Sequence, residues 1–179
     1  MSAGFTVRAA TPADVAAIAA IYADNVRTGT ATYEYVVPDK GEMHRRFDAI
    51  VEAGYPYFVA ADADDHVLGY SYASVYRSRP GYRYTVEDSV YVATHAARRG
   101  IGRALLSTVI AAFTTRGDRL MIAVLGDTAN VATMALHRAL GFEVAGKLPG
   151  VGWKFGRWLD GLLMCRALGD GTQSPAPGG

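Results

Sequence analysis

A glycine-rich loop flanked by arginines is the segment of this sequence whose residue types most clearly suggest chemistry. It follows an apolar run, opens a helical pattern and reads Arg98-Arg99-Gly100-Ile101-Gly102-Arg103-Ala104. Glycine lets a backbone turn tightly and expose consecutive N–H groups, and a helix N-terminus adds the positive end of its dipole. Such a loop predicts a diphosphate site, to which the arginines add charge-assisted hydrogen bonds. The alternative is a surface turn that is merely rich in arginine.

The order of residues excludes two common phosphate-binding loops. A Walker loop ends in Gly-Lys-Ser or Gly-Lys-Thr, which this loop lacks. A dinucleotide fingerprint requires a third glycine, where this chain has Leu105, and an early βαβ unit. The pattern that remains is Arg99-x-x-Gly102-x-Ala104.

Strands and helices on both sides must position this loop. An apolar run predicts a strand at residues 85–92, and helical spacing predicts a helix at 101–113. A buried strand at 119–125 and a helix at 130–140, stopped by Gly141, come next. Thr11, Pro12 and Asp14 have the order of a helix start. The remaining expected elements are strands at 5–8, 57–61, 67–75, 143–148 and 155–166 and a helix from 38 to 54.

Composition limits the possible classes of protein. The chain has 179 residues, which suits one domain at 1–168 followed by a disordered tail at 169–179 that is rich in Gly, Pro and Ser. The 18 basic and 17 acidic residues nearly balance, so nothing points to a nucleic acid or to an anionic membrane surface. The single cysteine, Cys165, excludes an internal disulfide and suits a reducing compartment. With no signal-like N-terminus and no long apolar run, a cytoplasmic location is expected.

The loop and the elements around it resemble the coenzyme A pyrophosphate loop of the GNAT acetyltransferase superfamily. Asn130 opens the next helix and Ala139-Leu140-Gly141-Phe142 closes it, as in that superfamily, and the order of elements matches as well. The resemblance implies an α/β (α+β) acyl-CoA N-acyltransferase fold, in which helices flank a central mixed, mostly antiparallel sheet. It also implies acetyl-CoA as co-substrate and no metal.

Three longer motifs resemble the phosphinothricin / methionine sulfoximine N-acetyltransferase subgroup. They lie at residues 85–92 (TVEDSVYV), 136–141 (LHRALG) and 152–160 (GWKFGRWLD). The subgroup implies transfer of acetyl to the amino group of a small amino-acid-like substrate, and a homodimer. Two alternatives stay open. The same fold could acetylate a protein N-terminus, a polyamine or an aminoglycoside, or the chain could be a non-catalytic coenzyme A sensor.

The resemblance also implies which residues hold acetyl-CoA. The backbone of Val90, Tyr91 and Val92 would pair with the pantetheine arm, and the loop from Arg98 to Ala104 would hold the diphosphate. Asn130 and Thr133 would lie beside coenzyme A. For Asn130 an N-cap is the structural alternative.

Glu87 and His137 are the catalytic candidates. Glu87 interrupts an apolar strand, and a carboxylate near the acetyl carbon can take the proton that the attacking amine must lose. Asp88 has the opposite strand parity and would face the other way. Many members of the superfamily have a tyrosine at the position of His137, where its hydroxyl protonates the departing thiolate. His137 would donate a hydrogen bond to that thiolate or assist Glu87, or it is a helix histidine satisfied by a backbone carbonyl.

Arg77, Tyr82 and Arg83 are the candidates for binding a substrate carboxylate, because an arginine pairs well with that group. Lys154 is expected to line the same substrate-binding cleft. Trp153 and Trp158 suit packing or a dimer interface. The arginines in this loop favour an anionic acceptor over a polycation.

Overall fold

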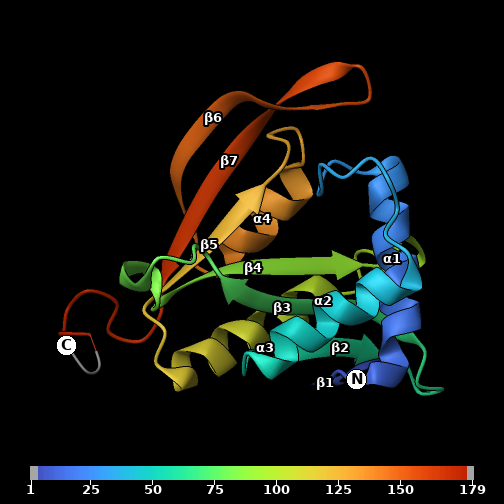
Figure 1. The fold of residues 1–179 in the computed structure, drawn as a ribbon, viewed down its shortest axis with the longest axis horizontal. Coiled ribbons are helices and arrows are strands. Elements are labelled where there is room, and N and C mark those ends of the chain that lie inside the picture. Colours follow the sequence, from blue (N-terminus) through green and yellow to red (C-terminus); the bar gives the residue numbers. More distant parts are fainter. Residues whose placement is uncertain (1–3, 177–179) are drawn as a thin grey trace. The chain divides into compact units, whose positions relative to one another are not determined.

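The described residues of the protein form one mixed sheet of seven strands with four α-helices, shown in Figure 1. The structure is a computed structural model that describes residues 4–176. Its elements are, in chain order, β1 (Thr6–Ala9), α1 (Val15–Thr28), α2 (Lys40–Glu52), β2 (Tyr57–Ala61), β3 (Val67–Val75), β4 (Thr85–Val92), α3 (Ile101–Arg116), β5 (Leu120–Leu125), α4 (Val131–Ala139), β6 (Glu143–Lys154) and β7 (Arg157–Ala167).

The strand order is β1-β2-β3-β4-β5-β7-β6. The pairs β1–β2, β2–β3, β5–β7 and β6–β7 are antiparallel, and β4–β5 is parallel. The expected mixed, mostly antiparallel sheet is therefore confirmed. Close contacts divide the chain into two compact units. The first comprises the residues up to Gly29, Glu34–Ala73 and Ser89–Val109, and the second comprises Thr30–Tyr33, Ser74–Asp88 and Ile110 onward.

Helices α1 and α2 pack together in the first unit and begin within three residues of the starts that the sequence predicts. Thr11 caps a short 3₁₀ turn at Pro12–Asp14 that leads into α1, and the carboxylate of Asp14 accepts hydrogen bonds from the backbone N–H and the hydroxyl of Thr11. The side chain of Asp39 caps α2 by accepting from the N–H of Glu42. Apolar side chains of both helices join β2 and β3 in the core of this unit.

In the second unit, β5 pairs with β4 on one side and with β7 on the other, and β6 and β7 form a long hairpin (Figure 1). The strand expected at 143–148 is longer in the structure, because β6 continues to Lys154 through a register shift between Leu148 and Gly152. The strand expected at 155–166 is β7, which begins two residues later and ends one residue later. Pro149 has no N–H to donate to a ladder. The N–H of Gly150 instead donates to the carboxylate of Asp160, 2.8 Å away, which ties the irregular segment to β7.

The described part of the C-terminal segment, residues 169–176, consists of turns and bends. Arg119 donates hydrogen bonds to the hydroxyl of Ser174 and to the carbonyl of Pro175. Residues 177–179, the rest of the expected disordered tail, lie outside the described residues. Within residues 4–176, no helix is both long and apolar enough to cross a membrane.

We expect Asp14→Asn to destabilise the protein at pH 7 by about 1–3 kcal/mol, the usual range for charge-assisted hydrogen bonds. The buried Asp14 carboxylate receives two 2.8 Å hydrogen bonds from Arg8, which lower its pKa. A lowered pKa adds stability above the unfolded-state pKa, about 3.9, that is lost as the pH falls through the folded-state pKa. Urea unfolding should therefore show a gap between variant and wild type that closes below about pH 4. The control Asp24→Asn, at an exposed carboxylate on α1, should show little change, and an equal loss in both variants would contradict the assignment.

Candidate active site

Glu87 lies half-buried on β4, in register with Ile122 of the parallel strand β5. Ile122 is in turn in register with Cys165 of β7, so the carboxyl group of Glu87 has an apolar neighbour on the sheet. Burial, and then the negative charge of Asp88, raise the pKa of the Glu87 carboxyl group. A carboxylate with a raised pKa is a stronger base, which suits proton removal from an amine.

Asp88, the next residue, turns to the other face of β4 and meets His137 of α4. The carboxylate oxygen Oδ2 of Asp88 lies 3.2 Å from the ring nitrogen Nε2 of His137, and both side chains are buried, with exposed fractions of 2% and 3%. The other oxygen of Asp88, Oδ1, is buried without a hydrogen-bond partner. The sequence placed Asp88 on the opposite side from Glu87, but it did not identify His137 as its partner.

Both nitrogens of the His137 ring face acceptors. The nitrogen Nδ1 lies 2.8 Å from the carbonyl oxygen of Thr133, one helical turn earlier, and Phe142 packs edge-on against the ring. Burial opposes a charged ring, but the carboxylate of Asp88 and the carbonyl of Thr133 outweigh it and raise the pKa of His137. The backbone contact is the one expected of a structural helix histidine. The side-chain partner of the ring is Asp88 rather than Glu87.

The start of α4 is fixed by short-range hydrogen bonds. The side-chain oxygen of Asn130 accepts from the N–H of Thr133 at 3.2 Å, so the N-cap alternative for Asn130 is present in the structure. Asp127 accepts from the N–H of Ala129 and pairs with Arg157 of β7 at 2.6 Å. These contacts set the position of the two residues that the sequence assigns to coenzyme A.

The glycine loop lies in the first unit and has the backbone of an anion site. Arg98 and Gly100 have φ angles of +60° and +82°, and α3 begins directly afterwards at Ile101. Backbone that alternates between left- and right-handed conformations forms a concave set of N–H groups. A side chain at Gly100 would meet no other atom within 4 Å, so the loop is open to a ligand there. The loop therefore fits the diphosphate of coenzyme A.

Residues 90–92 of β4 are closely backed by β3. A Cβ atom at Gly69 would lie 2.8 Å from the carbonyl oxygen of Tyr91, so only glycine permits this approach. The hydroxyl of Ser71 also donates to the carbonyl of Ser89 at 2.8 Å. These contacts hold the backbone that the sequence assigns to the pantetheine arm.

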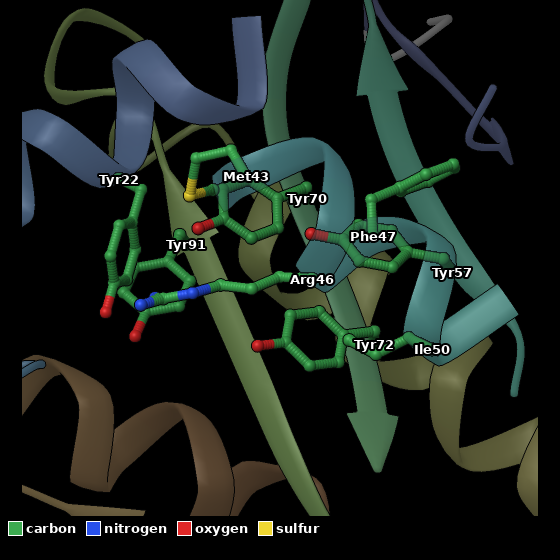
Figure 2. A pocket seen from close by; sticks show the side chains of 9 residues that line it. All are labelled: Tyr22, Met43, Arg46, Phe47, Ile50, Tyr57, Tyr70, Tyr72 and Tyr91. Atoms are coloured by element: carbon green, nitrogen blue, oxygen red, sulfur yellow. The ribbon is translucent and has the colours of Figure 1, made fainter. Parts of the chain in front are cut away.

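The side chain of Tyr91 enters an aromatic pocket of about 60 Å³, shown in Figure 2. Several tyrosines that line this pocket pack face to face. For example, the ring centroids of Tyr57 and Tyr72 are 4.6 Å apart. Arg46, which the sequence did not single out, forms part of the wall and pairs with Glu34 and Glu42. The complete lining is Tyr22, Met43, Arg46, Phe47, Ile50, Tyr57, Tyr70, Tyr72 and Tyr91.

A hollow of about 290 Å³ in the second unit is lined by Arg77, Ser78, Arg79 and Tyr82. The guanidinium carbon of Arg77 lies 5.8 Å from the centre of the Tyr82 ring. Two of the three expected carboxylate-binding residues thus come together. Arg83 is not among the lining residues and stacks on Tyr84 instead, whereas Arg79 lines the hollow and was not predicted from the sequence.

Lys154 is buried, and its ammonium donates to the carbonyl oxygen of Thr32 at 2.8 Å. The neighbouring Tyr33 donates its hydroxyl to the carbonyl of Gly126 at 2.6 Å and covers Gly152, where any side chain would collide with its ring. In the structure, Lys154 therefore fastens the segment 30–33 to the β6–β7 hairpin.

The turn between β2 and β3 brings the ligand atoms of Asp62, Asp64 and His66 within 4.8 Å of one another. The carboxylate of Asp62 accepts from the backbone N–H groups of Asp64 and His66, at 3.0 and 2.9 Å. These bonds account for the cluster as part of an exposed turn, so we assign no metal to it.

We expect Asp88→Asn to reduce stability most at low pH. A raised histidine pKa adds stability below the unfolded-state pKa, about 6.5, that is lost as the pH rises through the folded-state pKa. Urea unfolding should show a loss of about 1–3 kcal/mol at pH 6, the range for a hydrogen bond to a charged group, and a smaller loss at pH 9. The control Asp48→Asn, at an exposed residue of α2, should show no such pH dependence. A loss that grows toward pH 9 would rule out the charged pair.

Comparison with known proteins identifies the family of this chain. Residues 7–163 match the family described as "Acetyltransferase (GNAT) domain". The chain is 51% identical to a phosphinothricin N-acetyltransferase of Alcaligenes faecalis, over 93% of this chain and 84% of the relative. It is 42% identical to an L-methionine sulfoximine/L-methionine sulfone acetyltransferase of Pseudomonas paraeruginosa, over 89% and 92%. A GNAT phosphinothricin acetyltransferase of Sinorhizobium meliloti, solved with acetyl-CoA, superposes with a TM-score of 0.95 at 47% identity, over 98% and 95%. The chain therefore belongs to the GNAT family and is an acetyl-CoA-dependent N-acetyltransferase, as its motifs predict.

Proposed function

We propose that the protein transfers acetyl from acetyl-CoA to the amino group of a small amino-acid-like substrate of the phosphinothricin, methionine sulfoximine or methionine sulfone type. The relatives at 51% and 42% identity act on such substrates by name. The observation on this chain that carries the proposal is the hollow walled by Arg77 and Arg79, because two guanidinium groups match the carboxylate of an amino acid. A polyamine would be repelled there.

Glu87 acts as the general base in this proposal. The amine attacks the thioester carbonyl carbon, and the carboxylate of Glu87 takes a proton from the nitrogen, directly or through a water. The C–N bond forms, the C–S bond breaks, and the thiolate takes up one proton to leave as a free thiol. Binding both substrates together supplies the alignment that this direct attack needs.

Acetyl-CoA is held, in the same proposal, by three parts of the chain. The loop from Arg98 to Ala104 binds the diphosphate through backbone N–H groups, and the backbone at residues 90–92 pairs with the pantetheine arm and polarises the thioester carbonyl. Asn130 and Thr133 lie beside coenzyme A. Lys154 supports the acceptor side indirectly, by holding the segment 30–33 in place.

We also propose that the protein is a homodimer and that it is located in the cytoplasm. The β6–β7 hairpin exposes Trp153, Phe155 and Trp158, the last with 67% of its surface accessible. Exposed aromatic side chains are typical of protein interfaces. The single half-buried Cys165 suits a reducing compartment.

Glu87→Gln should lower kcat/KM by about 10²–10⁴ near neutral pH, the usual contribution of a general base. The change keeps the size of the side chain and removes its basicity. Release of free thiol from acetyl-CoA measures the rate, and calorimetry should show unchanged acetyl-CoA affinity. A variant with most of its activity left would show that Glu87 is structural.

Arg77→Gln should raise KM for methionine sulfone by about 10–100-fold, because the variant loses a charge-assisted hydrogen bond to the acceptor carboxylate. The same variant should treat the matching amine without a carboxylate as the wild type does. Arg27→Gln, at an exposed residue of α1, is the control.

The acceptor class is tested on the wild type with a panel of amines. The enzyme should acetylate methionine sulfone, methionine sulfoximine and phosphinothricin faster than spermidine or an aminoglycoside. A preference for spermidine would overturn the acceptor class, and no thiol release with any amine would favour the sensor.

A further inference from the structure

We propose that Asp88 and His137 form a buried charge pair that tunes how readily Glu87 accepts a proton, and that His137 positions β4 rather than protonating the departing thiolate. This inference rests on the proposed role of Glu87 as the base. Neither Asp88 nor a link between it and His137 follows from the sequence motifs or from the family assignment.

The first step is the hydrogen bonding of the His137 ring. A carbonyl oxygen 2.8 Å from Nδ1 and a carboxylate oxygen 3.2 Å from Nε2 are both acceptors, so each ring nitrogen must share a proton with its neighbour. A neutral imidazole has a single N–H and satisfies only one of them. An imidazole, with an ordinary pKa of about 6.5, is a stronger base than a carboxylate, at about 3.9, so the proton between Oδ2 and Nε2 is assigned to the ring. The ring is then an imidazolium that donates to both the Asp88 carboxylate and the Thr133 carbonyl.

The second step is that neither N–H of His137 is available for chemistry. Proton donation from Nε2 would break the pair and leave the buried carboxylate of Asp88 with no partner, since its other oxygen already has none. A buried charge without a partner is strongly unfavourable. His137 therefore affects the reaction only through its interaction with Asp88.

The third step links the pair to Glu87. Asp88 is adjacent to Glu87 in the chain, and its negative charge disfavours a second carboxylate there. The positive charge of His137 partly cancels that effect from the far side of Asp88. Because Asp88 and His137 are 2–3% exposed, water screens them poorly. The neighbour of Glu87 on β5 is apolar Ile122, and the next titratable group in that row is Cys165 on β7. On this side of the strand no charged residue that the structure describes is in register with Glu87, and the charge that raises its pKa is that of the adjacent Asp88.

The test measures kcat/KM as a function of pH in the wild type and in the variants. The midpoint of the acid limb of this profile reports the pKa of the base in the free enzyme. Asp88→Asn removes the negative charge, so the limb should move to lower pH. His137→Gln removes the compensating positive charge, so the limb should move to higher pH. We expect each shift to be about 0.5–2 pH units, the size of one charge acting at this range. Asp88→Asn/His137→Gln should resemble Asp88→Asn, because the histidine charge depends on the carboxylate.

The matched control is Asp118→Asn, which removes another buried carboxylate of the same unit, paired with Arg116 at 2.8 Å. It should leave the acid limb in place. Shifts of both test variants in the same direction, or lower kcat with no shift, would overturn the proposal. If the fall in activity at high pH disappears in His137→Gln but not in Asp88→Asn, then His137 is the acid that protonates the departing thiolate.

A second measurement needs no variant to be active. NMR titration of the His137 ring in the wild type should show a pKa above the ordinary value of about 6.5 that falls in Asp88→Asn. An ordinary or lowered wild-type pKa would overturn the pair. The two proposals can fail separately. An active Glu87→Gln variant would contradict the role of Glu87 as the base. An inactive Glu87→Gln variant, together with an unmoved acid limb in Asp88→Asn and His137→Gln, would contradict only the tuning.

Discussion

The alternation of side chains along β4 is the constraint on which the chemistry of this protein depends. Two carboxylates that are adjacent in the chain, Glu87 and Asp88, must point to opposite faces of the strand. Glu87 remains half-buried, and Asp88 is enclosed against α4. If both pointed the same way, the like charges would repel each other more strongly and would raise the pKa of one carboxyl group further. Alternation lets one strand carry both the proposed base and the buried Asp88–His137 pair.

This division also explains why a histidine lies at a position where much of the superfamily has tyrosine. A tyrosine hydroxyl is neutral across the physiological range and would leave Asp88 without a counter-charge. An imidazolium supplies that charge and also donates to the carbonyl of Thr133, one turn earlier in the same helix. In this chain, a change at residue 137 would therefore alter the charge next to Asp88.

Much of the fold could be predicted from the sequence, because its signals are local. The cap at Thr11 and the start of α3 after the glycine loop depend on residues within a few positions of each other. The pairing of Asp88 with His137 could not be predicted in the same way, because 49 residues separate the two and periodicity gives only the face of each element. The signal available in the sequence was strand parity, which places Asp88 on the face opposite Glu87 but does not name its partner.

The hollow at Arg77 shows a second limit of local reasoning. The sequence identified an arginine-rich loop, yet a turn at residues 80–82 decides which arginines face the hollow, and it selects Arg79 rather than Arg83. A guanidinium stacked on an aromatic ring, like that of Arg83 on Tyr84, keeps its charge but loses freedom to reorient. Arg77 also lies over an aromatic ring, that of Tyr82, but within the hollow. The Tyr82 ring thus orients Arg77 before the proposed substrate arrives, which would reduce the entropy lost on binding.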